Sequence, residues 1–170
     1  MYKKFSSENF YYNLAQREIV LVIIFLVSLY SYTLFHSIAE IISVAIGFGV
    51  YMVTWNSRRL IANQYFVFLG IAFFFIATFD LFHAYTYQGI GIFSSFYNFN
   101  LSDHFWLAAR FLQAFSFLVA AFYIGKGLKT MRIFYFYAFI SCIFVIAILW
   151  WPSLPPTYLN GIGQTSFKVI

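Results

Sequence analysis

The chain has 170 residues, of which 63% are hydrophobic and only 9% are charged, and its formal net charge is +5. A soluble globular domain carries charged residues at about a quarter of its positions. The composition therefore excludes a soluble domain and indicates an integral membrane protein.

Five apolar runs follow one another along the chain. Each is long enough to cross a hydrocarbon core about 30 Å thick at a rise of about 1.5 Å per helical residue. They predict an all-α integral membrane protein, a single domain over residues 1–170 formed by a bundle of five transmembrane helices. The predicted helices cover residues 19–35, 38–55, 65–85, 105–124 and 133–151.

The connections complete this predicted bundle. A polar lead precedes the first apolar run and no small-residue cleavage site follows it, so we expect the run to stay as an anchor. An outer loop is expected over 86–104, where Ser102 and Asp103 would cap the fourth helix. Prolines stop the fifth helix before an outer tail over 152–170. Cys142, the only cysteine, is expected to fill space in the fifth helix.

Basic residues mark one side of the predicted membrane spans. They are Lys3, Lys4, Arg17, Arg58, Arg59, Lys126, Lys129 and Arg132. Because cytoplasmic ends carry the excess of Lys and Arg, the N-terminus is expected in the cytoplasm. The positive net charge then matches anionic headgroups of the inner leaflet, and no nucleic-acid partner is needed to explain it. Within this group, Arg58 and Arg59 with Asn56 are expected to close the second helix at the cytoplasmic side.

Five ionisable residues stand within or beside the apolar runs, in the predicted outer half: His36, Glu40, Asp80, His83 and Arg110. A bilayer tolerates such side chains only where a function or a partner requires them. His36, in the predicted turn after the first helix, and Glu40 are four residues apart, and Asp80 and His83 are three apart, so each pair shares one helix face. We expect two histidines in an outer layer and two carboxylates about one turn deeper, where Arg110 bridges them.

The residue types of this cluster leave several chemistries open. The cluster could bind a small molecule, a proton or an ion, or it could be a hydrogen-bonded plug that only locks the helices. His36, Glu40, Asp80 and His83 could also hold a divalent metal such as zinc or iron, with His104 as a further candidate ligand. A haem between His36 and His83 is disfavoured, because neighbouring helix ends bring the two imidazoles too close. A transporter is disfavoured because the chain has no repeat and no polar residues in the inner half of the predicted spans.

Ordered motifs along nearly the whole chain resemble one known family. They are Leu34–Glu40, Trp55–Arg59, Phe68–Ala72, Asp80–His83, Trp106–Arg110 and Gly161–Lys168. Together they are similar to the third family of bacterial and archaeal membrane-associated sensor domains.

The resemblance implies a function as a sensory input module in the bacterial or archaeal cytoplasmic membrane. Such a module is not itself an enzyme; it precedes a cytoplasmic histidine kinase of a two-component system or a cyclic-di-GMP synthase or phosphodiesterase, and it is expected to form a homodimer. The family's recurrent polar positions match His36, Glu40, Asn56, Asp80, His83 and Arg110, whereas His104 departs from its pattern. The family also has a sixth helix, and this chain ends where that helix is expected to begin.

Overall fold

The computed structural model describes residues 7–87, 99–150, 154–159 and 163–165. The chain divides into two compact units, residues 1–39 and residues 40–170, and each is described by itself. The predicted outer loop falls mostly outside the described residues, as does part of the predicted outer tail.

The first unit contains helix α1, Ser7–Tyr30, and the first turns of helix α2, Tyr32–Ser57. Ser31 separates the helices, and its Oγ accepts a hydrogen bond from the Leu34 amide at 3.3 Å. This bond satisfies one of the amides that a helix start leaves unpaired. The predicted turn around His36 is therefore wrong, because the helix break is set by the serine cap and His36 lies inside α2.

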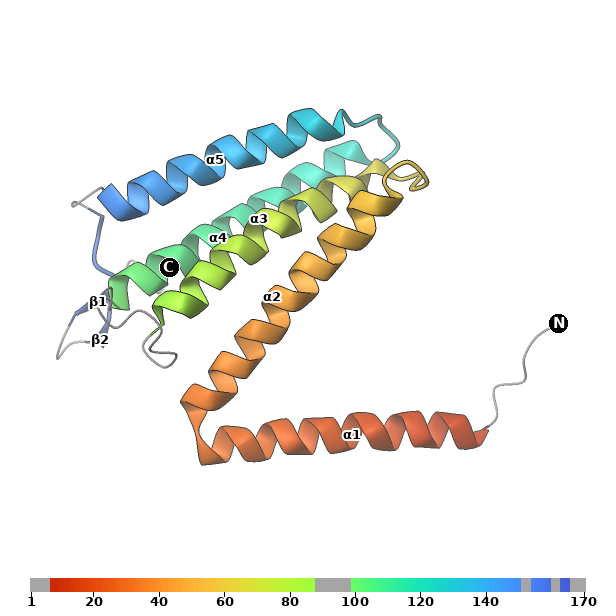
Figure 1. The fold of residues 1–170 in the computed structure, drawn as a ribbon, viewed down its shortest axis with the longest axis vertical. Coiled ribbons are helices and arrows are strands. Elements are labelled where there is room, and N and C mark those ends of the chain that lie inside the picture. Colours follow the sequence, from red (N-terminus) through yellow and green to blue (C-terminus); the bar gives the residue numbers. More distant parts are fainter. Residues whose placement is uncertain (1–6, 88–98, 151–153, 160–162, 166–170) are drawn as a thin grey trace. The chain divides into compact units, whose positions relative to one another are not determined.

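The second unit holds the rest of α2 and three further α-helices, which run side by side in Figure 1. Helix α3, Gln64–Thr86, agrees with its prediction to within one residue at each end, and Asn63 caps its start by accepting from the Tyr65 amide at 3.1 Å. Helix α5, Thr130–Trp150, begins three residues earlier than predicted.

Helix α4, Phe99–Ala120, begins six residues before its predicted start and continues into the short 3-10 helix η2, Ala121–Tyr123. Ser102 and Asp103 thus lie within the helix, and the prediction that they cap it is wrong. The prediction followed the apolar run from Phe105, whereas the helix also includes polar residues outside that run.

Among the described residues, four helical segments are long and apolar enough to cross a membrane: α2, α3, Asn100–Tyr123 and α5. This agrees with the predicted all-α membrane architecture. The fifth span and the cytoplasmic position of the N-terminus stay predictions.

The described part of the tail is fastened to the start of α4. Asn100 Oδ1 accepts hydrogen bonds from the amide and the hydroxyl of Thr157, at 2.8 and 2.9 Å. Two short antiparallel strands follow, β1 over Tyr158–Leu159 and β2 over Gly163–Gln164.

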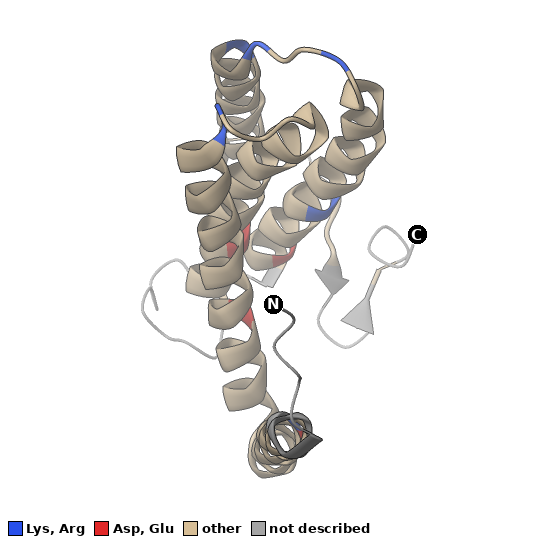
Figure 2. Cartoon of the chain, turned by 90° about the vertical axis from the view of Figure 1, so that its right-hand side faces the viewer, with Lys and Arg blue, Asp and Glu red and all other residues tan. Residues whose placement is uncertain are grey.

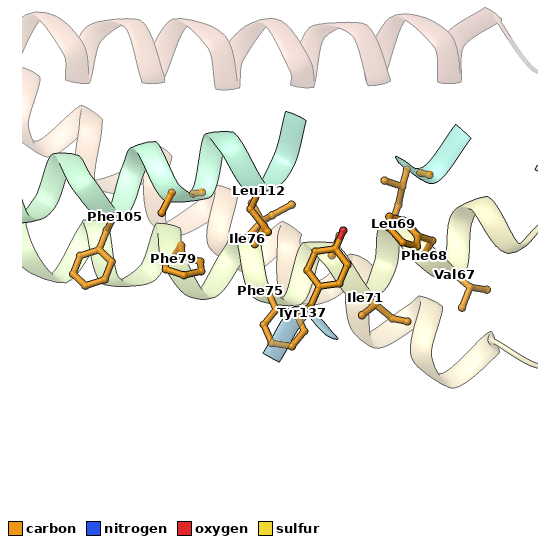
Figure 3. Close-up of a cluster of buried hydrophobic side chains, with 14 residues drawn as sticks. Val67, Phe68, Leu69, Ile71, Phe75, Ile76, Phe79, Phe105, Leu112 and Tyr137 are labelled. Atoms are coloured by element: carbon orange, nitrogen blue, oxygen red, sulfur yellow. The ribbon is translucent and has the colours of Figure 1, made fainter. Parts of the chain in front are cut away.

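The core of the second unit is built around α3, which is buried along most of its length (Figure 3). Tyr137 of α5 packs against Phe68 and Phe75 of α3, and its hydroxyl lies 2.6 Å from the hydroxyl of Ser116 on α4. Because both hydroxyls are buried, this hydrogen bond satisfies polar atoms that would otherwise be costly there. Apolar packing and one polar link thus hold three helices in fixed register.

Candidate functional site

His83 links three helices through its imidazole ring. Its Nε2 lies 2.8 Å from Glu40 Oε1 on α2. Its Nδ1 lies 2.7 Å from the carbonyl oxygen and 2.8 Å from the hydroxyl of Ser102 on α4. The side chains of His83 and Glu40 are only 7% and 15% exposed, so these contacts are largely shielded from solvent. One side chain of α3 thereby holds both neighbouring helices.

The partners of His83 constrain its protons. The carbonyl oxygen of Ser102 only accepts, so its hydrogen bond with His83 Nδ1 requires an N–H on Nδ1. A neutral ring would then present a lone pair on Nε2 toward the Glu40 carboxylate. The 2.8 Å contact therefore contains a proton, carried either by the imidazole or by the carboxyl group. A proton is thus an integral part of this pair.

Asp80 and Arg110 form the second polar link of the cluster. Arg110 Nη2 donates to both carboxylate oxygens of Asp80 at 2.6 Å, and its Nη1 donates to Gln113 Oε1 at 2.8 Å. The Arg110 side chain is 39% exposed and that of Asp80 is 19% exposed. Among the described residues, no acceptor bonds the buried Nε of Arg110. The Nε–H of the guanidinium therefore remains available to a further acceptor.

The cluster is arranged differently from the prediction in one respect. Glu40 and His83 contact each other and lie at the same depth, whereas the prediction put the carboxylate about one turn below the histidines. Positions counted from helix ends do not give this relation, because Glu40 lies eight residues after the start of α2 whereas His83 lies three residues before the end of α3. Arg110 was predicted to bridge Glu40 and Asp80. The structure shows its ion pair with Asp80, which joins α3 to α4.

His36 belongs to the first unit and is described there. It lies in the second turn of α2, four residues before Glu40, and its ring stacks on Tyr32 with the ring centroids 5.9 Å apart. Its spacing from Glu40 along one helix is the relation that the sequence predicted.

At the predicted helix end, Asn56 lies in the last turn of α2, and Arg58 and Arg59 follow the helix. Arg58 Nη1 donates to the Trp55 carbonyl, and its guanidinium carbon lies 4.4 Å from the centre of the Trp55 ring. Asn56 donates to the Met52 carbonyl at 2.9 Å. Arg58 thus satisfies one of the carbonyls that a helix end leaves unpaired.

A family model described as MASE3, a membrane-associated sensor domain, matches residues 27–170. The chain belongs to this family. The predicted family is thereby confirmed, and the MASE3 match includes every residue of the polar cluster. Neither a curated protein nor a solved structure matches the chain.

Two residues that bond members of this cluster are not among the residues predicted from the sequence. Ser102 was assigned to a helix cap, and only the packing of α4 against α3 reveals its contacts with His83. Gln113 follows Arg110 by three residues, a spacing that lets helical side chains meet, so this partner could have been found.

Proposed function

We propose that this MASE3 domain detects a small ligand, an ion or a metal at the cluster of Glu40, Asp80, His83 and Arg110, together with His36. Its output would be a cytoplasmic histidine kinase or cyclic-di-GMP enzyme joined to the domain. The observation that carries the proposal is the largely buried pair of His83 and Glu40, which connects α3 to α2 while His83 also holds α4.

The pair supplies a means of converting binding into helix movement. A ligand that competes for Glu40 or for His83 Nε2 would break the link between α2 and α3. Losing one partner of a buried charged pair costs about 3–5 kcal/mol, while shifting a two-state equilibrium from 1:99 to 99:1 requires about 5.5 kcal/mol. The energy in this contact is therefore of the size that a conformational switch needs, provided that the ligand prefers one helix arrangement.

The cluster favours polar ligands over apolar ones. A cation could replace the proton between His83 and Glu40, with the imidazole nitrogen and the carboxylate oxygen as its ligands. The remaining donor on Arg110 suits an acceptor group of a small molecule.

The test measures output in native membranes from the receptor that carries this domain. Glu40→Gln and His83→Gln keep similar volumes but break the charged pair, so each is expected to shift basal kinase or cyclic-di-GMP activity at least about tenfold toward one state. His104→Gln is the matched control, since His104 bonds the Pro155 carbonyl and stands outside the cluster. Normal output from both cluster variants at normal membrane levels would make the cluster purely structural.

A metal site is the second candidate, favoured by the donor types of the buried pair. His36, one turn before Glu40 on α2, would add a third ligand of a type that zinc and iron accept. Elemental analysis of the purified protein is expected to find stoichiometric metal that His83→Gln removes. An absorption spectrum checks for haem, and the absence of both metal and a Soret band would refute this candidate.

The same proposal places the domain in its cellular setting. The sensor would lie in the cytoplasmic membrane of a bacterium or archaeon with its N-terminus inside, as the distribution of basic residues favours. It would act as a homodimer, and the domain itself would catalyse no reaction. Reporter fusions at the N-terminus test the orientation, because an inside terminus gives activity only with a cytoplasmic reporter.

A further inference from the structure

Basic residues gather at one end of the helices in the second unit (Figure 2). An open groove of about 760 Å³ lies there, where α2 ends, α3 begins and the η2–α5 connection passes. Arg58, Arg59 and Lys126 line it, with the polar side chains of Gln64 and Thr130. Lys129 and Arg132 stand close by in sequence but are not part of its lining.

Within residues 40–170, no acidic side chain lies near this groove. The sequence has no Asp or Glu between residues 41 and 79 or after residue 103. In the second unit, Glu40, Asp80 and Asp103 are separated from the groove end of their helices by about 25 Å, at about 1.5 Å per residue. This exceeds the screening length of about 8 Å at physiological salt. The countercharge must therefore come from outside residues 40–170.

The groove is also shaped to admit a ligand. Gly125 turns the chain with a φ of 70°, a conformation that side chains disfavour. A Cβ at Gly125 or at Gly127 would meet no atom within 4 Å, so the space on both sides of Lys126 is open. The Lys126 side chain is exposed and can reach a group bound in this space.

The surroundings of the groove favour a lipid over a free anion. It lies at the ends of helices that are apolar enough to span a membrane. Leu60, next to Arg59, is 87% exposed, and Met131 on the groove wall is 53% exposed. Trp55 beside Arg58 is a residue type enriched at the membrane–water interface. Cations beside exposed apolar side chains match a phosphate attached to acyl chains.

We propose that this groove binds the phosphate-containing headgroup of an anionic phospholipid in the adjacent leaflet. Arg59 and Lys126 contact the phosphate oxygens, while Arg58 is held on Trp55 and supplies a fixed positive charge. The site is distinct from the polar cluster and adds a lipid dependence that the proposed sensing function does not require.

The test compares two double variants that lose equal charge in the full chain. Arg59→Gln with Lys126→Gln removes two groove residues, and Lys129→Gln with Arg132→Gln removes two neighbours outside the lining. The purified proteins are titrated in detergent with phosphatidylglycerol, phosphatidylcholine or inorganic phosphate, and thermal unfolding is followed. Phosphatidylglycerol is expected to raise the Tm of the wild type and of the neighbour variant, with apparent affinity at least about tenfold weaker in the groove variant.

Three results would overturn the proposal. An equal loss of apparent affinity for phosphatidylglycerol in both double variants would mean that positive charge in general, and not the groove, attracts the lipid. Equal stabilisation by inorganic phosphate would assign the site to a free anion, and equal stabilisation by phosphatidylcholine would remove the charge requirement.

If the groove variant does not fold, mass spectrometry of the intact wild-type and Lys126→Gln proteins, with their bound lipids, decides the question. Retention of phosphatidylglycerol over phosphatidylcholine is expected in the wild type, and its absence there, or its full persistence in Lys126→Gln, contradicts the site.

Discussion

Asp80 and Arg110 are held in a fork in which one guanidinium nitrogen donates to both carboxylate oxygens. Asp80→Asn would leave the guanidinium without its countercharge, and we expect the free energy of unfolding to fall by about 1–3 kcal/mol, below the value for a fully buried pair because Arg110 is 39% exposed.

The double variant Asp80→Asn with Arg110→Gln tests this pair further. It is expected to recover part of the loss, with a coupling energy of about 0.5–3 kcal/mol measured by chemical unfolding in detergent. Strict additivity of the two single variants would show that the pair contributes no interaction of its own.

At the scale of residues, the ionisable side chains that are unfavourable in a bilayer could be identified from the sequence, but only some of their partners could. The spacing of Asp80 and His83 put both on one face of α3, and each bonds a neighbouring helix. Ser102 could not be predicted, because a serine near a helix start has several common roles and only tertiary packing brings it to His83. Charge predicts which residues need a partner, whereas helix register decides which partner they find.

At the scale of helices, α2 and α3 approach each other closely at two glycine positions, Gly47 and Gly70. A Cβ added to Gly70 would lie 2.4 Å from the Cβ of Thr54, so Gly70→Ala must push the helices apart. We expect a loss of about 1–3 kcal/mol in the free energy of unfolding. Gly49→Ala on α2 is the matched control. A Cβ there meets no atom within 4 Å, and the change should stabilise by about 0.5–1 kcal/mol.

Chemical unfolding in detergent measures both glycine variants. Equal effects of the two changes would contradict the close packing of α2 on α3.

Helix existence was predictable from apolar run length, but helix ends were not equally so. The cap by Asn63 coincides with the start of the apolar run, and α3 was predicted to within one residue. Ser31 interrupts the helix inside an apolar stretch, and α4 starts in polar sequence before its apolar run. Hydrophobicity predicts which segments can span the bilayer, whereas side-chain hydrogen bonds and local turns set the ends of helices.

At the scale of the molecule, the chain belongs to a family of membrane-associated sensor domains, and the function that we propose requires a bound stimulus to change helix packing. The buried pair of Glu40 and His83 is the contact that we propose for this coupling. The aromatic core around α3 and Tyr137 would give the movement a rigid frame, since α3, α4 and α5 are held together independently of the pair.

The most direct test is the distance between spin labels on α2 and α4, both outside the cluster. Labels are placed at Val53→Cys and Leu118→Cys, two exposed positions, after Cys142→Ser removes the native thiol. With Glu40→Gln, we expect a second population or a change of about 2 Å or more in the mean distance, while His104→Gln leaves the distribution unchanged. Identical distributions in the wild type and Glu40→Gln would contradict coupling through this pair.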